Sequence, residues 1–238
     1  IGQGEGANFV VPRSIEGKID SFSQQKALSI FRSLVEQEFG SYMHFLFDTG
    51  DRTLIGASPE RHLSVRNGLV TMNPISGTLR KTRGRISESE LMEFLRDPKE
   101  IHELFMVLDE ELKMMSQMCE GGGEVYGPFL KEMSNLIHTE YILQGRSDKD
   151  VMELLRKSMF VPTVTGSPIE SACKVICKYD PRSRGYYSSA IVFLGYDENG
   201  KDTLDSSIII RSVQIDKDGE FRIMSGSTIV RDSDPVSE

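Results

Sequence analysis

Turn signals between short β-rich runs are the feature that most limits what this chain can fold into. Asn67-Gly68 stands between two such runs, and similar signals occur at residues 49–51 and 217–219. Each signal predicts a hairpin of antiparallel strands. Apolar residues at helical spacing predict a first helix at 24–39, before these strands, and further helices between the two strand regions, after Ser87, from Asp97 to about Gly121, near 150–159 and near 169–179. Strands, then helices, then strands predict an α+β fold with antiparallel sheets.

The charge balance narrows the range of partners. The 238 residues include 28 Lys and Arg against 36 Asp and Glu, for a net charge of −8, which argues against a nucleic-acid or anionic-membrane surface. No apolar run approaches the roughly 18 residues of a membrane span, and residues 1–9 do not resemble a signal peptide. We therefore expect a cytoplasmic protein that binds neither nucleic acid nor membrane. We also expect a piece of a longer chain, because it begins with Ile and stops abruptly.

The three cysteines are too few and too scattered for a disulfide framework or a four-ligand zinc site. Free cysteines are among the most frequently buried residues, so we expect Cys119, Cys173 and Cys177 to be part of the core.

Arg211 raises a question of charge compensation. If SIIIRSVQI (207–215) is one strand, Ile209, Arg211, Val213 and Ile215 share a face that is otherwise apolar. A guanidinium on that face requires an anion, which could be a protein carboxylate or a ligand.

Two carboxylates are candidates for chemistry. Glu60 follows Ser58-Pro59 where a strand gives way to a turn, a position from which catalytic acids often project. Glu103 lies on a helix that is apolar on both faces, so its side chain could enter a cavity as a metal ligand, although an exposed surface position is the commoner case.

Two polar segments could bind an anion. Residues 74–78 read as a tight polar turn that presents backbone N–H groups, and residues 163–168 open a helix whose N-terminus favours negative charge; either could also be an ordinary loop. His138 is the histidine best placed for proton transfer, with a core role as the alternative, whereas His44, His62 and His102 look structural or exposed. Nucleotide, serine-hydrolase and zinc-protease motifs are missing.

Six motifs stand in a fixed order along the whole chain: SPE (58–60), PISGT (74–78), TVTGSP (163–168), RGYYSSA (184–190), IIIRS (208–212) and SGSTIVRDSDPVSE (225–238). Together they resemble the chorismate-utilising enzymes, which include anthranilate, isochorismate and salicylate synthases. The stretches GEGANFVV (4–11), LDEELKMM (108–115), EGGGEVYGPFLKEM (120–133) and HTEY (138–141) are similar to the phenazine-pathway branch, whose product is 2-amino-2-deoxyisochorismate. Typical anthranilate synthases instead carry a DLxRND-like run at 109–114 and Lys where this chain has Ile169.

The resemblance implies a fold and a domain assignment. The expected fold is α+β, with two antiparallel sheets packed as a sandwich and flanked by helices. Residues 1–238 would be one chorismate-binding domain, the C-terminal core of a synthase whose N-terminal part and any amidotransferase domain lie outside this sequence.

The resemblance also implies the roles of individual residues. Mg²⁺ would bridge Glu103 and Glu238 to the ring carboxylate of chorismate, and Glu60 would protonate the departing 4-hydroxyl. His138 would be the second catalytic residue, which handles the pyruvyl ether. The substrate contacts would come from Arg211 and Tyr187 at the enolpyruvyl carboxylate, the Gly226 backbone, Thr163 near the ring, and Ser76, Gly77 and Thr78 of the PISGT motif.

The resemblance also indicates the nucleophile, through the residue Asn8. Relatives that add water carry a lysine base at this position, and because Asn cannot act as that base, ammonia is favoured. The ammonia would come from a glutamine amidotransferase, as a fused domain or a separate subunit, and a homodimer is possible. The alternatives are an anthranilate synthase, which also eliminates pyruvate, and a non-catalytic remnant that binds a small carboxylate or serves as a scaffold.

Overall fold

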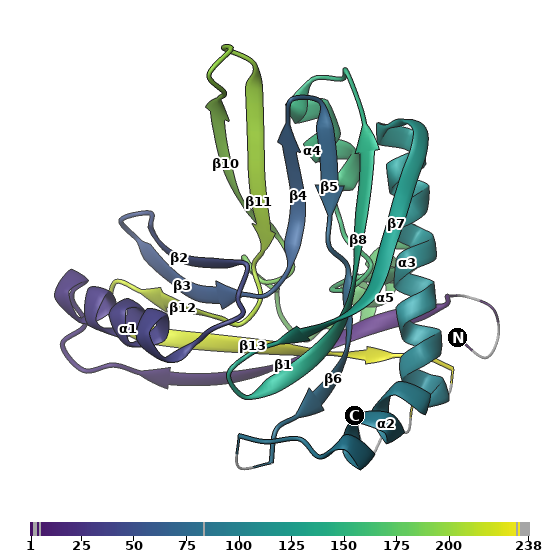
Figure 1. Cartoon of the computed structure of the whole chain (residues 1–238). Helices are drawn as coiled ribbons and strands as arrows, with labels where there is room; N and C mark the ends of the chain where they lie inside the picture. Colours follow the sequence, from purple (N-terminus) through teal and green to yellow (C-terminus); the bar gives the residue numbers. More distant parts are fainter. Residues whose placement is uncertain (2–3, 5, 83, 232, 234–238) are drawn as a thin grey trace.

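The computed structural model describes residues 1, 4, 6–82, 84–231 and 233. It contains two antiparallel sheets, and Figure 1 shows the strands of one running across those of the other. The fold class predicted from the sequence is confirmed. A membrane-crossing helix is not found in the part of the chain that the structure describes, since none of its helices combines the necessary length with a sufficiently apolar composition.

The six-stranded sheet has the order β2-β3-β12-β13-β1-β9. Its longest pairing joins the first described strand to the last, with Phe9 opposite Ile229 and Lys18 opposite Glu220. The strands are β1 (Asn8–Lys18), β2 (Met43–Asp48), β3 (Arg52–Ser58), β9 (Gly166–Ser167), β12 (Ser212–Asp216) and β13 (Glu220–Ile229).

The seven-stranded sheet has the order β10-β11-β4-β5-β8-β6, and β7 pairs with β8. Strands β5 and β6 both pair with β8, which carries His138. The strands are β4 (Arg61–Arg66), β5 (Leu69–Met72), β6 (Ile75–Arg80), β7 (Glu120–Glu132), β8 (Leu136–Arg146), β10 (Ala190–Tyr196) and β11 (Asp202–Ile208).

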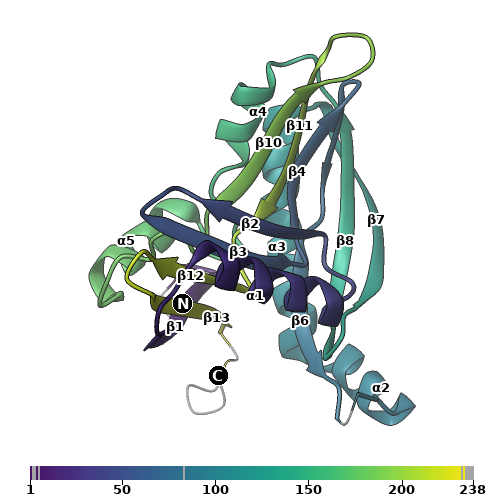
Figure 2. The ribbon, with the colours of Figure 1, turned by 90° about the vertical axis from the view of Figure 1, so that its left-hand side faces the viewer.

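The helices begin where the sequence predicts. Ser87 and Glu90 form the predicted capping box of α2, and Asp97 caps α3 with Pro98 in its first turn. Figure 2 shows α1 in front of β3, on the opposite side of the molecule from α3. The helices are α1 (Gln24–Gln37), α2 (Glu88–Arg96), α3 (Pro98–Met118), α4 (Val151–Ser158) and α5 (Ile169–Tyr179).

The largest core cluster lies between α3, α4 and the seven-stranded sheet, and includes Leu63, Met72, Met115, Leu143 and Leu154. The prediction for the cysteines is right for Cys119, which is buried, but wrong for Cys173 and Cys177. Both of these lie on the exposed side of α5, which buries little more than Ala172.

Two predictions about strands are wrong. Residues 74–78 are not a tight turn: residues 75–80 form β6, with an irregularity in its pairing to β8 between Ser76 and Leu79. Nor are residues 207–215 one strand, because β11 ends at Ile208, β12 begins at Ser212, and Arg211 between them has a φ of +52°. Arg211 therefore does not share a strand face with Ile209.

The chain crosses between the two sheets twice at one place, and these two links position the site. Strand β3 passes into β4 through Pro59 and Glu60, and β11 passes into β12 through residues 209–211. Since β3 pairs with β12 and β4 with β11, the two links lie side by side. The Ile208 N–H donates to the Glu60 carbonyl at 3.2 Å, and the Ala57 N–H donates to the Arg211 carbonyl at 3.2 Å. Glu60 and Arg211 are thus held together at the corner where the sheets meet.

Candidate active site

A pocket of about 220 Å³ opens at this corner. Its walls come from both sheets, from α3 and from the loops after α4 and α5. Ten of the residues predicted from the sequence are in its lining: Glu60, Ser76, Gly77, Thr78, Glu103, His138, Thr163, Tyr187, Arg211 and Gly226. Residues more than 160 positions apart in the chain therefore surround one cavity.

Glu60 is the most deeply buried carboxyl in the pocket wall, with 3% of its surface exposed. Burial raises the pKa of Glu60 to about 8, although hydrogen bonds from the Thr163 side chain and the Ile75 backbone oppose the shift, as does the charge of Arg211. The Thr163 hydroxyl donates to Glu60 Oε1 at 2.8 Å. Glu60 is therefore largely protonated at neutral pH and can donate a proton.

Arg211 and His138 form a contact that fixes the state of the imidazole. A guanidinium nitrogen of Arg211 lies 3.2 Å from His138 Nε2, and His138 Nδ1 lies 2.6 Å from the Gly77 carbonyl oxygen. Arginine only donates hydrogen bonds, so Nε2 accepts and the proton resides on Nδ1. Burial and the charge of Arg211 lower the pKa of His138 to about 4, which is consistent with a neutral ring.

In the described part of the chain, a carboxylate does not compensate the charge of Arg211. Among the described residues, Arg211 makes no ion pair, and its polar side-chain partner is the neutral His138. Burial of the guanidinium lowers the pKa of Arg211, but the group remains charged at any pH of interest. The sequence left open a protein carboxylate or a ligand as the compensating anion. Because the described residues supply no such carboxylate, the structure favours a ligand.

Tyr187 and Gly226 form another part of the wall. Burial raises the pKa of Tyr187 to about 12, opposed by Arg184, Arg211 and a hydrogen bond with the Gly226 backbone. A Cβ at position 226 would lie 2.3 Å from the Tyr187 hydroxyl oxygen, so only glycine allows this approach. The neutral phenol and the free guanidinium face the same cavity and could bind one carboxylate together.

Glu103 occupies the pocket from the side of α3. Burial raises the pKa of Glu103 to about 7, repulsion from Glu100 one helical turn away adds to the shift, and Lys99 and the hydroxyls of Ser76 and Thr228 oppose it. Carboxylate and hydroxyl oxygens are the donors that a hard divalent cation prefers, and a cation here would relieve the repulsion between the two glutamates. The residues present therefore fit Mg²⁺.

Only one of the two predicted metal ligands, Glu103, is among the residues that the structure describes. Glu238 lies outside the described residues, and these hold no group of three or more His, Cys, Asp or Glu side chains that could bind a metal.

Asn8 lies behind the pocket rather than in its lining. It starts β1 opposite Ser167, is 1% exposed, and its side-chain amide donates to the Pro162 carbonyl at 3.3 Å. Its Oδ1 is buried without a hydrogen-bond partner in the described part of the chain. Val10, two residues along the same strand face, does line the pocket.

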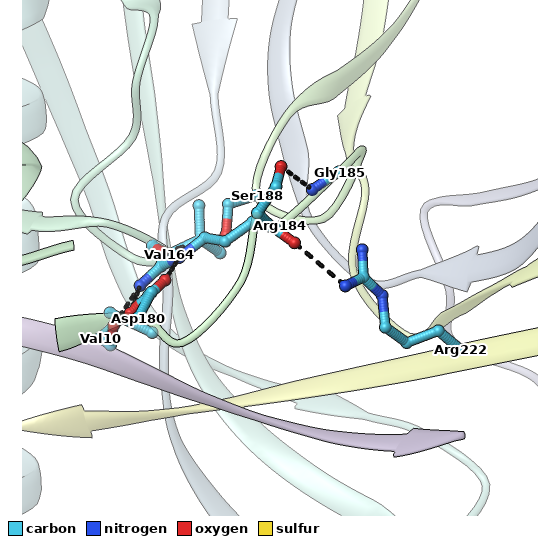
Figure 3. A network of polar contacts seen from close by, with 8 residues as sticks. Val10, Val164, Asp180, Arg184, Gly185, Ser188 and Arg222 are labelled. Carbon is cyan, nitrogen blue, oxygen red and sulfur yellow. Dashed lines mark hydrogen bonds and ion pairs between the residues drawn. The ribbon is translucent and has the colours of Figure 1, made fainter. Parts of the chain in front are cut away.

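Sequence reasoning missed Arg184, which braces two segments of the pocket lining through its contacts with Val10 and Val164 (Figure 3). Its guanidinium pairs with Asp180 at 2.6 Å and donates to the carbonyls of Val164, at 3.0 Å, and Val10, at 2.8 Å. The Arg184 and Asp180 side chains are only 9% and 12% exposed. The signal was the position of Arg184 at the start of the RGYYSSA motif, in which only Tyr187 was assigned a role.

Replacing Arg184 by methionine should destabilise the protein by about 3–5 kcal/mol, because Asp180 would remain buried without its partner. Chemical denaturation measures the change. Arg182→Met is a matched control, since Arg182 pairs with Glu16 on the surface and its loss should cost at most about 1 kcal/mol. Equal effects of the two substitutions would contradict the bracing role of Arg184.

Known proteins are similar to this chain along its whole length. The family model described as "chorismate binding enzyme" matches residues 1–238. The chain belongs to this family. It is 55% identical over all 238 residues to a protein of Pseudomonas chlororaphis named "Anthranilate synthase, phenazine specific", but spans only 37% of that relative.

Two solved structures share the fold. Anthranilate synthase component I from Streptococcus pneumoniae superposes with a TM-score of 0.81 at 26% identity, over 98% of this chain and 51% of that one. The menaquinone-specific isochorismate synthase from Escherichia coli gives a TM-score of 0.84 at 21% identity, over 100% and 54% of the two chains, and supports the fold alone.

Proposed function

We propose that this chain is the chorismate-binding core of an enzyme that aminates chorismate at C2 with loss of the 4-hydroxyl, giving 2-amino-2-deoxyisochorismate. One observation carries the proposal: a guanidinium that has no carboxylate partner among the described residues, a protonated buried carboxyl and a second carboxyl suited to a metal all open into one pocket. Chorismate is a dicarboxylate with a hydroxyl leaving group, so these groups match its chemistry.

Arg211 and Tyr187 bind the enolpyruvyl carboxylate in this proposal. The guanidinium supplies charge and a planar pair of donors, and the phenol adds a neutral donor. His138 holds the guanidinium from behind by accepting its hydrogen bond. Ser76, Gly77, Thr78, Thr163 and Gly226 complete the surface against which the ring lies.

Glu60 is the proposed general acid. As nitrogen bonds to C2 and the ring double bonds shift, the C4–O bond breaks, and the hydroxyl leaves as water with the proton of Glu60. The new ammonium group then returns a proton to the Glu60 carboxylate. A pKa of about 8 keeps the acid protonated before this step, and the Thr163 hydroxyl stabilises the carboxylate after it.

Glu103 and Glu238 would hold Mg²⁺ in the proposal, and the ion would supply Lewis-acid neutralisation of the ring carboxylate. Ammonia is the proposed nucleophile. Asn8 cannot act as a base toward water, whereas its unpaired buried Oδ1 can accept a hydrogen bond from an N–H group. A glutamine amidotransferase, fused or separate, would supply the ammonia, in a cytoplasmic enzyme.

A second candidate product is anthranilate, which the name of the Pseudomonas chlororaphis relative favours. It requires elimination of pyruvate after amination.

The two products are distinguished by incubating the full-length protein with chorismate, MgCl₂ and an ammonium salt and identifying the product by NMR. We expect aminodeoxyisochorismate and no pyruvate. Stoichiometric anthranilate and pyruvate would assign the second candidate. The absence of any turnover, in protein shown to be folded, would contradict both and favour a non-catalytic carboxylate-binding protein.

A further inference from the structure

The active-site pocket meets solvent through a second cavity. Of the residues that line the pocket, Glu60 and Ile75 are buried, whereas Thr78, Ser225 and Gly226 are exposed. These three exposed residues also line a second cavity of about 610 Å³, here called the outer cavity. A ligand that reaches the pocket from solvent by way of these residues therefore passes through the outer cavity.

The outer cavity lies where β13 loses a neighbouring strand. Strand β12 pairs with β13 only as far as Ile223, which is opposite Val213. Strand β13 continues to Ile229 with β1 as its partner. Beyond Ile223, one edge of β13 thus has no strand beside it in the described part of the chain. This stretch of β13 lines the outer cavity together with residues of β1, β6 and α3.

The lining of the outer cavity is rich in cations, although the net charge of the whole chain is −8. Its cationic residues are Arg13, Arg80, Lys99 and Arg211, and its acids are Glu100 and Glu103. Glu103 is the proposed metal ligand, so a bound divalent cation would make this lining more positive still.

Arg80 is the cation of this lining that is best placed to meet an anion from solvent. It is the last residue of β6, two positions beyond Thr78, and it is exposed. Its guanidinium makes no ion pair with any residue that the structure describes. By contrast, Lys99 Nζ lies 3.8 Å from Glu100 Oε1. The charge of Arg80 is thus available to a ligand.

We propose that the outer cavity is the entrance to the active site and that Arg80 attracts the dicarboxylate substrate into it. A cleft lined by charges of one sign raises the local concentration of an oppositely charged ligand and its rate of association. Without such a lining, the net negative charge of the chain would repel a dianion. The inference rests on the proposed function, because it takes the substrate to be a dicarboxylate.

Stopped-flow measurements on the full-length protein with MgCl₂ and an unreactive dicarboxylate analogue of chorismate test this role. At ~10 mM salt, where the Debye length is about 30 Å, Arg80→Glu should lower the association rate constant about 10-fold and Arg80→Gln about 3-fold. The dissociation rate constant should change by about twofold at most. At ~1 M salt, the Debye length is about 3 Å, and both variants should associate with the analogue as fast as the wild type.

Arg66→Glu is the matched control. Arg66 is also the exposed last residue of a strand in the same sheet, and it lines neither the pocket nor the outer cavity. The substitution changes the net charge by the same amount as Arg80→Glu, but should leave association close to the wild-type rate. Equal slowing by the two substitutions would overturn the proposal, since it would assign the effect to net charge alone.

The outcomes also separate the entrance from the proposed function. Unchanged association in Arg80→Glu, or an effect confined to dissociation, would overturn the entrance role while normal turnover of chorismate left the proposed function intact. Association that depends on Arg80 in a protein without turnover would support the entrance and contradict the proposed function. Failure of the folded wild-type protein to bind the analogue would overturn both.

Discussion

Arg211→Met is expected to lower kcat/KM for chorismate about 10²–10³-fold in the full-length enzyme. The substitution leaves the substrate carboxylate in the pocket without its charged partner, a loss that costs about 2–5 kcal/mol in comparable buried pairs. Most of the effect should appear in KM if the contact is equally strong in the ground state. Steady-state kinetics over a range of chorismate concentrations measures both constants.

Arg211→Lys is the informative companion variant. It keeps the charge but loses the planar fork that can contact a carboxylate and His138 Nε2 at once. We expect intermediate activity. Full activity in Arg211→Met would remove Arg211 from the substrate site, since no other described arginine or lysine lines the same pocket.

Glu60→Gln should lower kcat about 10²–10⁴-fold, the usual contribution of a positioned general acid, with a smaller change in KM. The amide keeps the shape of the side chain but cannot protonate a leaving hydroxyl. In the wild type, kcat/KM should fall as the pH rises through about 8, where Glu60 loses its proton. A variant with wild-type kcat would exclude Glu60 as the acid.

The same substitution should stabilise the protein at alkaline pH. The folded-state pKa of Glu60 is raised from 4.5 to about 8, so the folded state holds a proton that the unfolded state has released. This contribution to stability is complete below about pH 4.5 and is lost as the pH rises toward and beyond 8. Glu60→Gln removes the loss, so its Tm should exceed that of the wild type at pH 9 but not at pH 4. Glu88→Gln, at an exposed helix position, should show no such difference.

The sequence predicted the local elements well because their signals are local. The Ser87–Glu90 capping box, the Asp97 cap and the Asn67-Gly68 turn each depend on a few neighbouring residues, and all three occur as expected. The long β7–β8 hairpin was missed, because β7 has exposed residues along most of its length and lacks a clear alternation. Strand β6 was read as a turn because PISGT is rich in turn-forming residues, and Gly77 indeed has a φ of +61°.

The placement of Arg211 could not be predicted from periodicity. The run SIIIRSVQI alternates as one strand would, but the chain changes sheets within it, and this depends on pairing with β3 and β4, about 150 residues earlier. The identities of the site residues came from the resemblance to the family rather than from spacing. Arg184 was overlooked because its role depends on carbonyls of Val10 and Val164, which no local pattern reveals.

The central claim is that Arg211 binds a carboxylate of the substrate. Its most direct test is a crystal structure of the full-length protein with Mg²⁺ and an unreactive chorismate analogue. The account predicts the analogue's side-chain carboxylate within hydrogen-bond distance of Arg211 and Tyr187, with its ring beside Glu60. An Arg211 paired with a carboxylate of the protein itself, with the analogue bound elsewhere, would contradict it.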